Sequence, residues 1–137
     1  MDVTYLTGEE IEVIHYTLME LYEDSDQAGI KSHEKFELML DRPKTYYFGT
    51  EQFPTLLEKA CCYFHSIVRG HIFHNGNKRT GLTVLETFLN INGFELTMEE
   101  GTAEDFTVYA AKDERFKEND CIHYLVAELE DFIKPIW

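Results

Sequence analysis

The sequence has few basic residues and no long hydrophobic run. Only 12 Lys and Arg stand against 26 Asp and Glu, which gives a formal net charge of -14. This acidic excess argues against nonspecific binding to nucleic acid or to an anionic membrane, so any phosphate site must be locally basic. No apolar stretch reaches the roughly 20 residues that span a bilayer. The opening residues Met1-Asp2-Val3-Thr4 do not resemble a signal peptide.

Cysteine and proline are also sparse. Cys61, Cys62 and Cys121 are odd in number and show no CxxC or Cys/His metal spacing. They indicate structural thiols in a reducing, cytoplasmic environment rather than a disulfide framework. There is no Gly/Ser-rich linker, internal repeat or low-complexity tract to mark a domain boundary. With 137 residues, 44% of them hydrophobic, we expect one domain over residues 1–137 with a sizeable core.

Apolar residues recur at helical spacing through most of the chain. Thr7 with Glu10 and Thr55 with Glu58 match the capping box, and Ser32 matches a simple N-cap. We predict four helices: from Thr7 to about Tyr22, from Ser32 to before Pro43, from Pro54 to Val68, and from Lys78 to Asn92. A fifth helix is predicted to start at Thr102, with Asp105 as its capping partner. The last predicted helix carries the apolar residues Ile122, Leu125, Val126, Leu129, Phe132 and Ile133. The predicted fold class is all-α, a helical bundle.

Residues 42–53 depart from the helical pattern. Tyr46, Tyr47 and Phe48 precede Gly49, and we predict a short extended flap before the central helix pair. The alternative is a packed aromatic loop. Elsewhere, His65 beside an apolar stripe is predicted to be a structural polar residue, and Gly81 inside a helix predicts close packing against a neighbour.

Residues 71–79, with the sequence HIFHNGNKR, combine a histidine, a loop glycine, amides and two adjacent cations. The helical patterns on both sides predict a loop that leads into the first turn of a helix. First-turn N–H groups have no partner within their own helix and carry the positive end of the macrodipole. Together with Gly76, Lys78 and Arg79, they predict an anion site suited to nucleotide phosphate. His71 is the candidate general base, because imidazole titrates near neutral pH.

The motif HxFxNGNKR resembles the signature of the Fic/Doc superfamily, and its Asn-Lys-Arg ending is similar to the Doc (death on curing) branch. Similar segments in the same order include Gly29-Ile30, residues 38–43, residues 47–49, residues 53–56 and residues 88–93. The resemblance therefore covers most of the chain, from the first predicted helix to the last.

The resemblance implies a Fic/Doc-like bundle whose flap, residues Tyr46, Tyr47, Phe48 and Gly49, holds a target segment by strand addition. It further implies that His71 accepts the proton of an attacking hydroxyl. Phosphate contacts are then expected from Gly76, Asn77, Lys78 and Arg79, with Phe73 as a structural anchor and His74 exposed without a role. A core histidine at position 71, and an ordinary helix cap with solvated cations after it, are the alternatives without function.

In the Doc branch, the implied activity is kinase-like transfer of the γ-phosphate of ATP, with Mg²⁺, to a threonine of elongation factor Tu, which stops translation. Adenylyltransferases of the superfamily instead resemble HxFxxGNGRxxR, with glycine where this chain has Lys78 and arginine where it has Leu82. Adenylyl transfer is the alternative enzyme activity.

Asn75 departs from the family pattern, in which Asp or Glu holds the magnesium. Three outcomes stay open: Asn75 binds the metal through its oxygen or a water, catalysis is weak, or the protein is an interaction module. The inhibitory pattern [ST]xxxE[GN] does not occur in the chain. We therefore expect a separate small antitoxin with a helical tail to supply the restraint.

Overall fold

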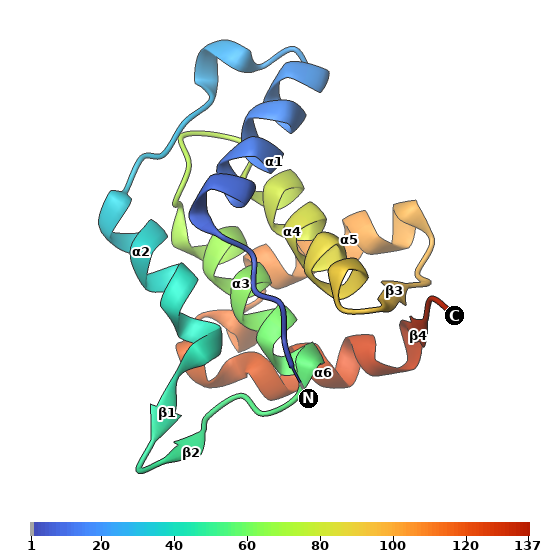
Figure 1. Cartoon of the computed structure of the whole chain (residues 1–137). Helices are drawn as coiled ribbons and strands as arrows, with labels where there is room; N and C mark the ends of the chain where they lie inside the picture. The colour runs from blue at the N-terminus through green and yellow to red at the C-terminus, as the bar shows by residue number, and fades with distance from the viewer. Residues whose placement is uncertain (1) are drawn as a thin grey trace.

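A buried helix, α3 (Leu56–Gly70), lies at the centre of the fold (Figure 1). In the computed structural model, which describes residues 2–137, α3 packs most extensively against α4 (Asn77–Ile91). α2 (His33–Asp41), α5 (Glu100–Lys112) and α6 (Ile122–Leu129) also contact α3, and α1 (Gly8–Leu21) packs on α4. The predicted all-α bundle is confirmed, and none of the helices in this part of the chain is long and apolar enough to cross a bilayer.

Short elements connect the helices. Residues 2–137 contain five single 3-10 turns and four strands of two or three residues: η1 (Ser25–Gln27), η2 (Arg42–Lys44), η3 (Glu114–Phe116), η4 (Asn119–Cys121), η5 (Glu130–Phe132), β1 (Tyr46–Tyr47), β2 (Thr50–Glu51), β3 (Phe94–Leu96) and β4 (Ile133–Pro135). β1 pairs with β2 and β3 pairs with β4, and both pairs are antiparallel.

Local side chains set the starts of the first three helices. The Thr7 hydroxyl accepts the Glu10 N–H at 3.2 Å, and the Glu10 carboxylate accepts the Thr7 N–H at 2.9 Å. Thr55 and Glu58 form the same reciprocal pair at the start of α3. Ser32 accepts one N–H at the start of α2. Each cap stabilises its helix by about 1 kcal/mol, and all three were predicted.

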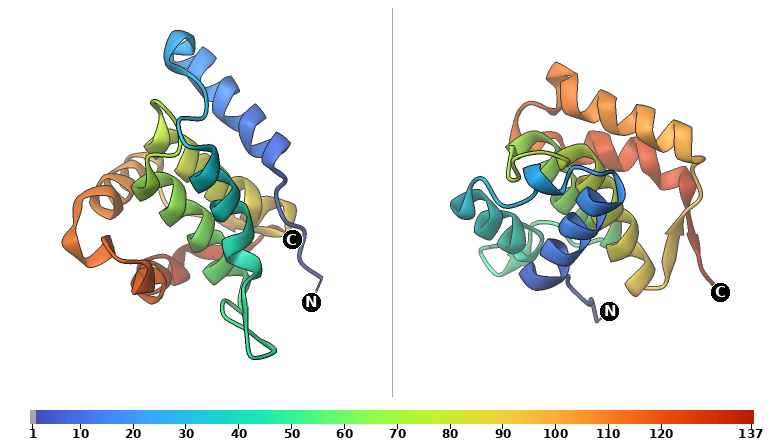
Figure 2. Two further views of the ribbon diagram at one scale, coloured as in Figure 1. Left: turned by 90° about the vertical axis from the view of Figure 1, so that its left-hand side faces the viewer. Right: turned by 90° about the horizontal axis from the view of Figure 1, so that it is seen from above.

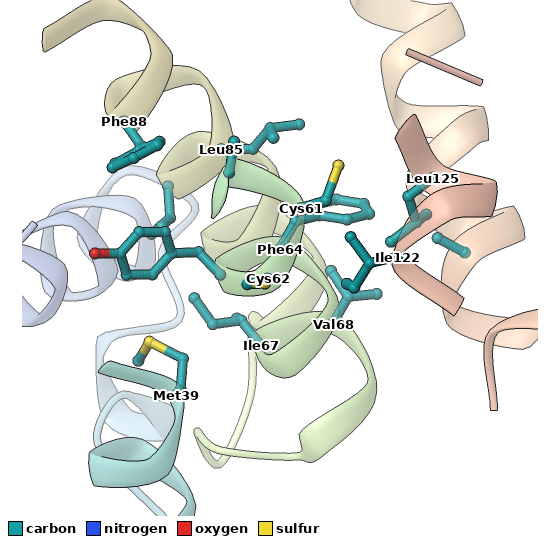
Figure 3. Packing of buried hydrophobic residues seen from close by; sticks show 14 of the residues in the cluster. Met39, Cys61, Cys62, Phe64, Ile67, Val68, Leu85, Phe88, Ile122 and Leu125 are labelled. Carbon is teal, nitrogen blue, oxygen red and sulfur yellow. The ribbon is translucent and has the colours of Figure 1, made fainter. Parts of the chain in front are cut away.

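The core forms where α3 meets its neighbours (Figure 3). Cys61 and Cys62 are fully buried there, and burial raises the pKa of the Cys62 thiol to about 12. Such a thiol is unreactive at neutral pH, which agrees with the structural role predicted for it. A Cβ added at Gly81 would lie 2.5 Å from Cγ2 of Val68, so the predicted close approach of α4 to α3 is confirmed.

His65 is a buried link between α3 and the 113–121 segment. Its Nε2 donates to the Phe116 carbonyl at 2.7 Å, and its Nδ1 accepts from the Arg42 guanidinium at 2.9 Å. Burial, together with the charges of Arg42 and Arg69, lowers the pKa of His65 to about 4 despite the opposing effect of the bond to Phe116. The prediction of a structural polar residue is confirmed.

The predicted start of the fifth helix is wrong. α5 begins at Glu100 with Glu99 at the N-cap position, and the Thr102 and Asp105 pattern lies inside the helix. The chain leaves β3 at Leu96 and turns into the helix within a few residues. The carboxylate of Glu100 in the first turn suits the helix dipole there.

The predicted last helix is too long. α6 ends at Leu129, and Phe132 and Ile133 lie outside it. Ile133 pairs with Leu96 in the β3–β4 ladder, and the Phe132 carbonyl accepts the Thr97 N–H at 2.7 Å. Pairing with a segment about 35 residues earlier ends the helix, and this constraint is absent from the local apolar pattern.

β1 and β2 form the predicted flap as a two-residue hairpin. Phe48 and Gly49 at its tip have φ values of 49° and 79°, as in the turn that matches strand twist in tight hairpins. The side chains of Tyr46 and Tyr47 are 61% exposed, and that of Phe48 is fully exposed. The alternative of a packed aromatic loop is therefore wrong. The hairpin precedes α3 and lies at the opposite end of this helix from the loop that follows it (Figures 1 and 2).

Candidate active site

His71 stands where α3 ends. It has a left-handed conformation with φ of 51°, which turns the chain out of the helix and leaves the side chain exposed. The carbonyl of Gly70, at the last turn, accepts a hydrogen bond of 3.1 Å from the Lys35 ammonium. A non-glycine residue in this conformation is uncommon and is found disproportionately at functional sites.

The segment between α1 and α2 holds the motif loop in place. The Ile72 carbonyl accepts the N–H groups of Lys31 and Ser32 at 2.7 and 3.1 Å. The His74 N–H donates to the Gly29 carbonyl at 3.0 Å. Because these bonds lie on both sides of Phe73, the loop has a defined backbone position, while the His74 side chain is exposed as predicted.

Phe73 anchors this loop on a buried histidine. Its ring is 1% exposed and stacks on His15 with the ring centroids 3.9 Å apart. Nε2 of His15 accepts the Gly29 N–H at 2.9 Å, so Nδ1 carries the proton and donates to the Thr80 hydroxyl at 3.0 Å. Burial, together with the charges of Arg79 and His74, lowers the pKa of His15 to about 4. His15 thus joins four segments as a neutral imidazole.

Gly76 precedes α4, at the start of the predicted anion site. Its φ is 72°, and a Cβ here would lie 2.5 Å from the sulfur of Met19, so only glycine fits. Asn77 closes the loop with its amide, which donates to the Phe73 carbonyl and accepts the Phe73 N–H, both at 3.0 Å. Asn77 keeps a second Nδ2 hydrogen and its backbone N–H for a ligand, and this backbone N–H precedes the first intrahelical bond, from Thr80 to Gly76.

The two cations of the motif differ in environment. The Lys78 side chain is exposed, whereas Arg79 is held by the loop after α1. Nη2 of Arg79 lies 3.1 Å from Oδ2 of Asp24, and its guanidinium lies 4.7 Å from the ring centroid of Tyr22. The local sequence gave no signal for this pairing, because 55 residues separate Asp24 from Arg79.

Asn75 was the predicted metal ligand. Its Oδ1 accepts the Gly76 N–H at 2.7 Å, and its Nδ2 donates to Oε1 of Gln27 at 2.8 Å. Within residues 2–137, no group of three or more His, Cys, Asp or Glu side chains could hold a metal ion. One amide oxygen with a single lone pair left fits a magnesium ion only when phosphate and water supply most of its ligands.

The motif lies between two cavities. The first, which we call the flap cavity, measures about 540 Å³ and is bounded by Gly70 and Ile72 beside His71 and by Thr45 and Gln52 at the base of the flap. It runs between α2 and α3 and so connects the motif with the hairpin.

The second, the cation cavity, measures about 590 Å³ and begins at Lys78 and Arg79. Leu82 and Met98 contribute apolar lining, and Glu86 contributes an acid whose pKa is raised by burial and by Glu100. Both volumes fall in the range of small-molecule sites.

A buried lysine fixes the base of the flap. Nζ of Lys59 on α3 donates to the Phe53 carbonyl at 2.6 Å, to the Pro43 carbonyl at 3.2 Å and to the Glu51 carboxylate at 3.2 Å. Burial acts to lower the pKa of Lys59, but Glu51 and Tyr5 outweigh it and the pKa is raised. Apolar periodicity alone placed this lysine in a helix and gave no sign that it binds both ends of the hairpin.

Comparison with known proteins agrees with this architecture. A family model described as the Fic/DOC family matches residues 5–89, which include the flap, α3, the motif and most of α4. The chain belongs to the Fic/Doc family. A relative named Toxin Doc from Mycolicibacterium smegmatis is 32% identical over 109 residues, which cover 77% of this chain and 79% of the relative. The Protein kinase doc of Escherichia phage P1 is 28% identical over 110 residues, with 80% and 84% covered. Both matches lie in the Doc branch of the Fic/Doc family.

Proposed function

We propose that this Fic/Doc protein is a Doc-like toxin that transfers the γ-phosphate of ATP to a protein hydroxyl. The observation that carries the proposal is the position of the motif between two cavities. Gly70 and Ile72, the chain neighbours of His71, line the flap cavity, which suits a protein segment. Lys78 and Arg79 line the cation cavity, which suits a nucleotide. A transferase needs both substrates to meet at one base and one phosphate site.

In the proposed reaction, the hydroxyl oxygen of the acceptor attacks the γ-phosphorus of ATP. The bond from that phosphorus to the β,γ-bridging oxygen breaks, ADP leaves, and His71 takes the hydroxyl proton. The exposed imidazole of His71 has the freedom to approach the acceptor. The first-turn N–H groups of α4 and the ammonium of Lys78 stabilise the charge on the transferred phosphoryl group.

Magnesium is proposed to enter with the nucleotide, where it would neutralise phosphate charge. The available oxygen of Asn75 fits a metal that takes its remaining ligands from phosphate and water. The family resemblance suggests elongation factor Tu as the acceptor, through a threonine hydroxyl, and inhibition of translation as the consequence. An acceptor segment that pairs with the flap would follow the flap cavity to reach His71.

Adenylyl transfer is the second candidate activity. It would place the α-phosphate where the γ-phosphate is proposed. Lys78 adds bulk and charge at the position where adenylyltransferases have glycine, and Leu82 replaces their second arginine. Both residues line the cation cavity and favour phosphate transfer. The third candidate is an interaction module, which is favoured by the engagement of the Asn75 amide with Gly76 and Gln27.

A small antitoxin with a helical tail is the proposed partner. The names of the relatives, Toxin Doc and Protein kinase doc, support a toxin, and the chain lacks the inhibitory pattern [ST]xxxE[GN]. Coexpression with the product of an adjacent small reading frame should relieve growth arrest and give a stable complex on gel filtration.

Mass spectrometry of an acceptor protein incubated with ATP, magnesium and this protein tests the function. Added phosphate on a threonine supports the kinase reaction. Added adenylate supports adenylyl transfer instead. Purified elongation factor Tu is the first acceptor to test, and an unmodified acceptor contradicts ATP and that acceptor as the pair of substrates.

A further inference from the structure

The loop after α1 covers the anion site at three points. Tyr22 and Asp24 contact Arg79, and Gln27 binds Asn75. These contacts join η1 and its flanking residues to Asn75 and Arg79 of the motif. The covering loop therefore belongs to the site, although its residues carry no motif of their own.

The Asp24 carboxylate binds the Arg79 guanidinium, which is the group that a phosphate would bind. Its Oδ2 lies 3.1 Å from Nη2 of Arg79, and the same nitrogen lies 3.6 Å from the position of a Cβ on Gly76. The carboxylate and an anion at the start of α4 thus compete for one guanidinium. The side chains of Asp24 and Arg79 are 32% and 27% exposed, so solvent screens their attraction and the pair can open.

The carboxylate of Asp24 has no second role in the local fold. Asp24 precedes η1, but its side chain makes no capping hydrogen bond there. The backbone holds the loop independently, through the bond of 2.7 Å from the Asp24 N–H to the Met19 carbonyl. Replacing the carboxylate with an amide therefore changes the charge at Arg79 without removing a helix cap.

We infer that Asp24 is an internal competitor that decides which anions this site accepts. A ligand must displace one carboxylate from Arg79, so a polyphosphate with several negative charges succeeds where a single weakly charged anion fails. Asp24 also repels the incoming phosphate until the ion pair opens. This inference rests on the proposed nucleotide site, and it names a restraint within the chain in addition to any antitoxin.

Calorimetric titration of the full chain with ATP and with AMP, each with and without magnesium, tests the inference. Asp24→Asn should tighten ATP binding by about fivefold, the equivalent of a screened surface ion pair. It should also reduce the preference for ATP over AMP. Asp26→Asn is the matched control, because it removes the same charge from the same loop at an exposed residue without an ion pair in the described chain.

Unchanged or weaker ATP binding by Asp24→Asn in the absence of magnesium would overturn the inference. Weaker binding only in the presence of magnesium would also overturn it, since Asp24 would then act as a metal ligand. If Asp26→Asn tightens ATP binding as much as Asp24→Asn does, the effect comes from the net charge of the loop. That result would contradict a role for the contact between Asp24 and Arg79. A different result contradicts the proposed function: ATP binds, but no phosphate is transferred to an acceptor protein.

Discussion

Single polar residues in the motif divide into those that hold the loop and those that face solvent. The Asn77 amide forms hydrogen bonds with the N–H and the carbonyl of Phe73, whereas the side chains of His71 and Lys78 are exposed. A buried or bracing polar group costs stability when it is removed, while an exposed one contributes little. Substitutions should therefore separate folding from activity at positions only a few residues apart.

His71→Asn should abolish target modification and leave the free energy of unfolding within about 0.5 kcal/mol of the parent. Asparagine tolerates the left-handed backbone of this position but cannot take a proton from the acceptor. Asn77→Ala, the comparison variant, should lose about 1–3 kcal/mol because it leaves the N–H and carbonyl of Phe73 without their partner. Urea denaturation and phosphorylation assays measure the two effects, and full activity in folded His71→Asn would exclude His71 as the base.

Asn75→Asp should tighten ATP binding in the presence of magnesium. The change restores a charged oxygen ligand at constant size, although it removes the hydrogen bond that Asn75 donates to Gln27. Without magnesium, the added negative charge should weaken ATP binding, so the two titrations are expected to move in opposite directions. Binding that does not depend on magnesium in either protein would mean that residue 75 does not face the metal.

At the scale of secondary structure elements, local chemistry was predictable and long-range pairing was not. The caps at Thr7, Ser32 and Thr55 follow from residues within one turn of each other. The early end of α6 depends on pairing between β4 and β3, and the apolar pattern alone extended the helix to Ile133. Sequence periodicity reports which face is apolar, but it does not report which distant strand competes for the backbone.

The candidate site shows the same division. Residues 71–79 form one contiguous loop and helix start, which is why the sequence located the site. His15 and Asp24, which contact this stretch or its supports, and Lys59, which holds the base of the flap, are distant in sequence and carry no motif. Their roles come from the packing of α1 and the flap against the central helix pair.

The contact between α3 and α4 can be tested through two glycines. Gly81→Ala should destabilise the protein by about 1–3 kcal/mol, because its Cβ would overlap Cγ2 of Val68 in a close-packed interface. Gly101→Ala in α5 meets no atom within 4 Å and should be neutral or slightly stabilising. Urea denaturation compares the two variants. Equal stability of both proteins would show that α3 and α4 are not packed at this distance.

At the scale of the whole molecule, two buried histidines should make stability depend on pH. The pKa values of His15 and His65 are lowered to about 4 in the fold, from about 6.5. Between these values the unfolded chain binds more protons, so the stabilisation present above pH 6.5 is lost as the pH falls towards 4. Each group contributes a slope of up to about 1.4 kcal/mol per pH unit.

Denaturation at pH 7, 6 and 5 should show the free energy of unfolding falling with acid. Replacing the exposed His33 and His123 with Gln should keep the slope, since neither side chain is buried. A slope that disappears in this double variant would assign the pH dependence to the surface and would contradict neutral, buried His15 and His65.

The central claim is that His71 and Lys78 direct the γ-phosphate of ATP to an acceptor hydroxyl. Its most direct test follows ATP labelled at either the α or the γ position into the acceptor protein. We predict label from the γ position only, none with His71→Asn, and a steep loss with Lys78→Gly, which makes room for some α transfer. Lys78→Met separates charge from bulk, because it keeps the length and should lower γ transfer without permitting α transfer. Label that arrives from the α position with the unmodified protein would contradict the kinase reaction.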